Sequence, residues 1–216
     1  MEYAAVRKGG RGFYAPMMMR YHMRMKPITF QNTVGHFRTI THHKLLVMQL
    51  MIRLGLVWQG INHDNSKYSP IEFWRGVRYF QGTRSPNAAE REDLGYTEAW
   101  MHHKGRNRHH FEYWMDIGKK PAKGFRGMPM PTRYIVEMFC DRVAACKVYQ
   151  QDAYTDASPL QYFLTHEYNL MMHPDTAAML EVMLRYLADN GEEAAIEYIR
   201  ENIVKPRFCY GEGARF

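Results

Sequence analysis

The sequence predicts an all-α fold on the basis of three observations. Apolar residues recur at steps of three and four in several stretches, which is the spacing of one helix face. Three Ser-Pro pairs precede such stretches, and a serine cap followed by proline is typical of a helix start. No segment has the alternating apolar and polar residues of a half-buried strand. We therefore expect one helical domain over 28–216, preceded by a loose segment over 1–27.

Composition narrows the kind of protein. Hydrophobic residues make up 46% of the 216 residues, and no apolar run approaches the roughly 20 residues of a membrane span. The formal net charge of +7 favours anionic partners such as nucleotides, other phosphate esters or nucleic acid. The 3 cysteines form no CxxC motif, which predicts a cytoplasmic protein with neither a disulfide framework nor a thiolate metal site.

The N-terminal segment 1–27 mixes glycine, basic residues and methionine, and it lacks the apolar core of a secretory signal. One interpretation is a basic tail that contacts nucleic acid. The interpretation we prefer is a flexible arm, or translated sequence upstream of the true start.

The first predicted helix covers 31–57. Its apolar face carries Ile40, His43 and Val47 at helical spacing. His36 shares this face, where a single histidine is more often a core residue than a ligand. His43 becomes a candidate metal ligand only because of residues later in the chain.

The loop predicted after this helix carries His63, Asp64 and Lys67. A Ser-Pro pair at 69–70 then begins a helix, and Glu72 stands where a capping box places glutamate. His63 and Asp64 therefore lie just before a helix start, where the backbone is constrained.

The stretch HHKGRNRHHFEYW, residues 102–114, holds four histidines within nine positions. A predicted helix over 97–104 ends at Gly105, and a short one over 109–116 follows. Because imidazole is the commonest protein metal ligand, the cluster indicates a metal site; the alternative is a polar surface segment. The candidate ligands in the cluster are His102, His103, His109 and His110.

A loop over 119–131, rich in proline, glycine and basic residues, is predicted to lie over the site. The clearest late helix, 132–150, has Asp141 within its apolar stripe. A buried carboxylate must be paired or metal-bound, because burying it alone is costly. A salt bridge to an arginine is the alternative, but the histidines elsewhere favour a ligand role. Further helices are predicted over 158–172, 175–190 and 192–204.

The order of these residues resembles the H…HD…D pattern of the HD superfamily of metal-dependent phosphohydrolases. Two segments, GINHDNSKYSPIEF and AWMHHKGRNRHHFEYW, are more similar still to a family of small proteins classed as a domain of unknown function, over about 36–164. The superfamily resemblance implies an HD-domain-like helical bundle with a metal-site core over about 36–150 and additional C-terminal helices over 158–204.

The resemblance implies that His43, His63, Asp64 and Asp141 bind one metal and that Asp64 bridges to a second. The two histidine pairs would bind that second metal, with the coordinating member of each pair left open. Lys67 matches the lysine of an HD-x-x-K variant. Two departures stand out: the GYP signature of cyclic-dinucleotide phosphodiesterases is absent, and no histidine lies between the HD doublet and the cluster.

A histidine and carboxylate site suits one or two divalent ions of Fe, Mn, Ni, Co or Zn. Two such ions can hold a hydroxide and clamp a phosphoryl oxygen, with the pKa of bound water lowered towards about 7. This predicts a phosphomonoesterase or phosphodiesterase that acts on a nucleotide or related phosphate ester through a metal-activated hydroxide. Asp64 and Lys67 are the candidate catalytic residues. The candidates for binding the substrate phosphate are Lys67, Lys104, Arg106 and Arg108.

Two alternative functions stay open. One is oxygen chemistry at a di-iron centre, as in one oxygenase branch of the superfamily; the other is a non-catalytic, metal-stabilised binding protein. Positive charge around the histidine cluster favours hydrolysis, because oxygenase substrates need not be anionic. For Arg106 and Arg108, a solvated basic loop is an equally good interpretation.

Overall fold

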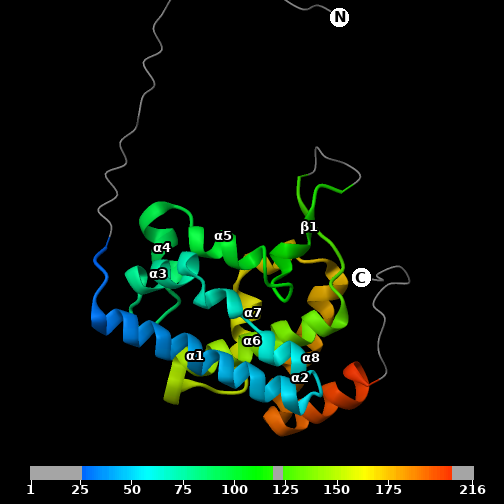
Figure 1. The fold of residues 1–216 in the computed structure, drawn as a ribbon. Helices are drawn as coiled ribbons and strands as arrows, with labels where there is room; N and C mark the ends of the chain where they lie inside the picture. The colour runs from blue at the N-terminus through cyan, green and yellow to red at the C-terminus, as the bar shows by residue number, and fades with distance from the viewer. Residues whose placement is uncertain (1–25, 119–123, 206–216) are drawn as a thin grey trace, which may run out of the picture.

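The computed structural model describes residues 26–118 and 124–205. Nearly all of the predicted N-terminal segment, 1–25, lies outside the described residues, as does 119–123 of the loop predicted to lie over the site. Within the described ranges the chain forms eight α-helices and one two-stranded antiparallel ribbon (Figure 1). The prediction of an all-α fold is confirmed. None of the helices in these ranges is both long and apolar enough to cross a membrane.

The elements follow one another with short connections. The α-helices are α1 (Phe30–Arg53), α2 (Val57–Asn62), α3 (Pro70–Tyr79), α4 (Pro86–Leu94), α5 (Glu98–Lys104), α6 (Thr132–Gln150), α7 (Ser158–Thr165) and α8 (Pro174–Ile199). The shorter elements are η1 (Asn65–Tyr68), η2 (Phe111–Trp114), β1 (Met115–Asp116), β2 (Arg126–Gly127), η4 (Gln151–Ala153), η5 (Glu167–Met171) and the π-helical η6 (Arg200–Val204).

The hydrophobic core is centred on α6, which packs against α1 and also against α8. The predicted apolar face of α1 is confirmed, because Ile40, His43 and Val47 are all buried. Helices α3, α4 and α5 group beside the N-terminal half of α1 (Figure 1). Core side chains from α6 and α8 include Ile135, Phe139, Val143, Leu180, Leu184 and Leu187.

Several predicted boundaries differ from the structure. Helix α1 ends at Arg53 because Gly55 adopts a left-handed backbone (φ 80°), and the predicted loop instead contains the end of α2 and all of η1. The helix predicted over 109–116 is only the 3-10 turn η2, followed by β1. The reason is that residues 115–116 pair with β2, which lies in the predicted loop over 119–131.

The C-terminal helices also differ in detail. Helix α7 ends at Thr165, earlier than predicted, because His166 adopts an extended backbone. The two helices predicted over 175–190 and 192–204 form α8 and η6, with a kink at Gly191 (φ 82°) close to the predicted break. The cap of α8 is His173, whose ring accepts a hydrogen bond from the backbone N–H of Asp175.

Candidate metal centre

Asp64 lies at the centre of the site, in the turn between α2 and η1. Its backbone has φ 53°, a left-handed conformation that is uncommon outside glycine but that aspartate tolerates. The side chain is 1% exposed. A non-glycine residue held in this way often marks a functional position. The turn thus places a carboxylate deep between α1, α5 and α6.

One group of possible ligands surrounds the Oδ2 side of Asp64 and consists of His43, His63, Asp64 and Asp141. The Nε2 atom of His63 lies 3.3 Å from Asp64 Oδ2 and 3.6 Å from Asp141 Oδ1. His43 Nε2 lies 2.9 Å from Asp141 Oδ1. A transition metal about 2.1 Å from each of its ligands holds neighbouring ligand atoms about 3.0 to 3.4 Å apart. The spacing in this group fits such an ion.

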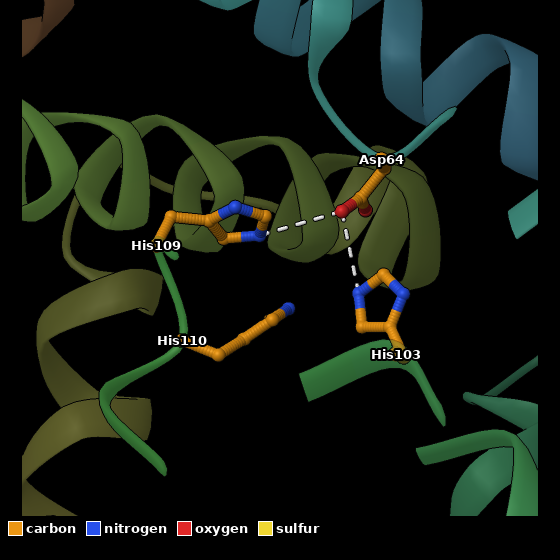
Figure 2. Close-up of side chains that lie close together, drawn as sticks. All are labelled: Asp64, His103, His109 and His110. Atoms are coloured by element: carbon orange, nitrogen blue, oxygen red, sulfur yellow. Dashed lines mark ion pairs between the residues drawn. The ribbon is translucent and has the colours of Figure 1, made fainter. Parts of the chain in front are cut away.

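A second group surrounds the other oxygen of the same carboxylate. Asp64 Oδ1 lies 3.3 Å from His103 Nε2 and 3.4 Å from His109 Nε2, and His110 completes the group. Figure 2 shows His103 and His109 directed at Asp64, with the His110 ring pointing into the space between them. Asp64 therefore belongs to both groups, one oxygen to each.

Unsatisfied polar atoms show that these residues fit metal ions. The Nε2 atoms of His63, His103, His109 and His110 are buried and have no hydrogen-bond partner among the described residues, and the same holds for Asp64 Oδ1. Buried polar atoms without a partner are rare and costly. Five of them facing one small space are satisfied at once if the space holds cations. The donor set, imidazole and carboxylate without thiolate, suits transition metals of the Fe, Mn and Zn kind.

The protonation states of these histidines and of Asp64 also fit metal binding. Burial lowers the pKa of His43 to about 4 and that of His110 well below its ordinary value, so both rings are neutral, the form that binds metals. Burial alone would raise the pKa of Asp64, but the charges of His63 and Lys67 outweigh it and keep the carboxylate ionised. For His63 and His103, burial alone would lower the pKa, but Asp64 outweighs it and raises the pKa. Protons and metals therefore compete for these two rings.

A cavity of about 500 Å³ adjoins both groups. Its wall includes His43 and Asp141 of the first group and His103 and His110 of the second. The volume is in the range of small-molecule binding sites. A small organic molecule can therefore reach both groups of possible ligands from this cavity.

A family model described as a family of unknown function (DUF5662) matches residues 32–186. The chain belongs to this family. The matched region contains both ligand groups and all of the residues that line the cavity. No curated protein and no solved structure matches the chain.

Two carboxylates hold the histidines of this DUF5662 protein in orientation. Oε1 of Glu137 accepts a hydrogen bond from His63 Nδ1 at 2.8 Å and lies 3.2 Å from His109 Nδ1. Burial alone would raise the pKa of Glu137, but these two histidines outweigh it and lower the pKa to about 2. Each ring thus points its Nε2 at Asp64. A carboxylate behind a ligating histidine is a usual feature of metal sites, since it fixes the tautomer and the ring orientation.

Glu72 has the same role for His103, whose Nδ1 donates to Oε2 at 2.7 Å. The capping box predicted for Glu72 is therefore wrong. Ser69 does precede α3 as predicted, but its hydroxyl makes no capping hydrogen bond, and the Glu72 side chain bonds to histidines instead. His102 Nδ1 donates to Oε1 of the same carboxylate at 2.5 Å, and His102 belongs to neither ligand group.

The cationic residues predicted to bind substrate divide into two sets. Lys67 lines the cavity, and its Nζ lies 2.6 Å from Asp64 Oδ2. The other three, Lys104, Arg106 and Arg108, do not line the cavity. Arg106 bonds to the backbone of α5, and Arg108 donates to the Tyr134 hydroxyl. These two side chains are exposed, as the solvated-loop interpretation expected.

Sequence reasoning missed Glu137, Glu72 and Arg142. Glu137 lies four residues before Asp141, one helical turn away, and this spacing within an apolar stripe was an available signal. Glu72 was assigned to a cap. Nothing in the sequence singled out Arg142, which the structure buries in the cavity wall. His36 packs against Phe73 and Phe80, as expected for a core residue.

Replacing Glu137 by glutamine is expected to weaken metal binding by about 10- to 100-fold, the usual cost of losing such a supporting carboxylate. The neutral amide keeps the size of the side chain and an accepting oxygen, but it lacks the negative charge that attracts the Nδ1–H groups of His63 and His109. Metal affinity is measured by competition with a chelator. Glu181→Gln, at an ion pair on the surface of α8, is the matched control and should leave the affinity unchanged. An unaltered affinity in Glu137→Gln would contradict a supporting role.

Proposed function

We propose that the protein is a two-metal phosphohydrolase, a phosphomonoesterase or phosphodiesterase that acts on a nucleotide or related small phosphate ester. The observation that carries the proposal is Asp64, which offers one oxygen to each of two adjacent ligand groups. A carboxylate shared in this way is expected where two metals lie close together. Paired divalent ions activate water and neutralise charge on a phosphoryl group.

The chain supplies the remaining parts of the reaction. In this proposal His43, His63, Asp64 and Asp141 hold one ion, and Asp64 with His103, His109 and His110 holds the other. The substrate phosphate enters from the cavity, where Lys67 places a positive charge beside Asp64. That ammonium group stabilises the negative charge that grows on the phosphoryl oxygens as the ester bond breaks.

The resemblance to the HD superfamily supports this chemistry. The residues of the first ligand group occur in the order H…HD…D, and Lys67 stands at the lysine of the HD-x-x-K variant. Membership in DUF5662 adds no substrate, because the family is described as one of unknown function. The reaction class therefore rests on the site itself.

Metal content is the first test. Protein purified without a histidine tag or chelator is expected to carry more than one divalent transition metal per chain, measured by elemental analysis. The same preparation is then assayed against a panel of phosphate monoesters and diesters, with and without prior chelation. Turnover that is lost on chelation and restored by one metal supports the proposal. Less than one metal per chain, or no turnover of any ester, contradicts it.

One observation favours oxygen chemistry as the second candidate function. Much of the cavity wall near the metal centre is apolar, with Ile40, Trp100, Phe111 and Met138 among its residues. Such a wall suits an organic substrate that is oxidised at a di-iron centre. Oxygen consumption by iron-loaded protein, or a mixed-valent iron signal, would support this alternative. Metal without either activity would instead indicate a metal-stabilised binding protein.

A further inference from the structure

Arg142 is a buried cation that forms no ion pair with any residue the structure describes. It follows Asp141 on α6, and its side chain lines the cavity with only 9% of its surface exposed. Its Nη2 donates to Asn169 Oδ1, a neutral amide, at 2.9 Å. Its Nη1 is buried and has no hydrogen-bond partner among the described residues. One terminal nitrogen of the guanidinium is therefore unused.

The other cationic side chains of the cavity wall are paired. Lys67 forms an ion pair with Asp64, and Arg84 forms one with Glu92. Arg142 forms none with any residue that the structure describes, and what packs on its guanidinium is aromatic: the rings of Tyr162 and Phe163, 5.8 and 5.6 Å away. Burying an unpaired charge is costly, so proteins pair buried charges or use them to bind ligands.

Neighbouring carboxyl groups do not neutralise Arg142. Asp141 is adjacent in the chain, but its Oδ1 accepts a hydrogen bond from His43. Glu112 also lines the cavity, but no ion pair joins it to Arg142 among the described residues; burial raises the pKa of its carboxyl, although the charges of Lys104 and Arg142 oppose this. No described carboxylate therefore forms an ion pair with Arg142, whose side chain lines a cavity that an outside anion can enter.

The cavity extends away from the metal centre along α6. Arg142, Ala145, Cys146 and Tyr149 line it at steps of three and four, so one face of the helix forms this wall. Arg142 directly follows Asp141, so the two side chains leave the helix about 100° apart. A molecule that lies in the cavity with one end on the metals can therefore contact Arg142 with a second group.

We propose that Arg142 binds a second anionic group of the substrate. This rests on the proposed function, in which the metal centre takes a phosphate group. The substrate class is then an organic phosphate with a further carboxylate or phosphate, separated from the first phosphate by an apolar body. A planar guanidinium with a free N–H edge suits either anion, since both accept two parallel hydrogen bonds.

The test uses ligands that resist hydrolysis. Alkylphosphonates of increasing chain length are prepared with three different ends: a carboxylate, a second phosphonate, and a neutral carboxamide. Dissociation constants are measured by calorimetry on the full chain with its metals. At one chain length, an anionic end is expected to strengthen binding about 10- to 100-fold over the carboxamide, the range for a charged hydrogen bond. The anion with the larger gain identifies the substrate class.

Variants assign the gain to Arg142. Arg142→Met should abolish this gain in affinity. If the methionine variant does not fold, Arg142→Gln, which keeps a neutral donor for Asn169, replaces it and should also abolish the gain. Arg84→Met, which removes a paired cation from the same cavity wall, should retain it. The inference is overturned if the anionic ends do not strengthen binding at any chain length, or if they strengthen it equally in the Arg142 variants. Phosphonate binding that ignores chelation would count against the proposed function alone, because an Arg142-dependent gain does not require metal.

Discussion

Replacing Asp64 by asparagine is expected to remove both metals from the site and to reduce turnover to the background rate. Asp64 offers an oxygen to each ligand group, whereas asparagine has one oxygen and no charge. The backbone is preserved, because asparagine also tolerates the left-handed conformation of residue 64. The measurement is metal content per chain, together with turnover of the best phosphate ester.

Two further variants make the result specific. Asp175→Asn changes a carboxylate that is 69% exposed at the start of α8 and should keep both metals. Asp64→Ala should lose the metals and also lower stability, because alanine is strained at φ 53°. Circular dichroism checks that the asparagine variant remains helical. Full metal content in a folded Asp64→Asn protein would show that the carboxylate does not bridge two ions.

Replacing Lys67 by methionine is expected to leave the metal content unchanged while turnover falls about 10²- to 10³-fold, the scale of losing one such donor. Burial alone would lower the pKa of Lys67, but Asp64 and Asp141 outweigh it and raise the pKa, so the ammonium keeps its charge at neutral pH. Its position in the cavity wall lets it act on the substrate phosphate. Methionine fills similar space without charge. The measurement is kcat alongside elemental analysis.

The matched control is Lys205→Met, at an exposed lysine paired with Glu201, which should match the unmodified protein. Two results would contradict the proposed role of Lys67. Loss of metal would mean that the lysine maintains the ligand groups through Asp64, and unchanged turnover would mean that its charge does not act on the reacting phosphate.

Sequence periodicity predicted helix faces well and side-chain partners poorly. Ile40 and Val47 of α1 are buried as expected, because the spacing of apolar residues along a helix is a local property. Glu72 shows the limit. Its position predicted a capping role, which also depends on local spacing, but the carboxylate bonds to His102 and His103 of α5. The backbone N–H of Ser69, which a capping box would offer to this glutamate, instead donates to the Ser66 carbonyl.

By itself, the sequence determined the all-α class and the residue types available to a metal centre, because helical spacing and ligand chemistry belong to the residues. Tertiary structure alone decided which of two adjacent histidines faces Asp64. His103 does, while His102 turns away to Glu72. Neighbouring positions on a helix point about 100° apart, so only the packing of α5 on α3 selects one. The supporting role of Glu137 and the isolation of Arg142 likewise come from contacts between α6 and distant segments.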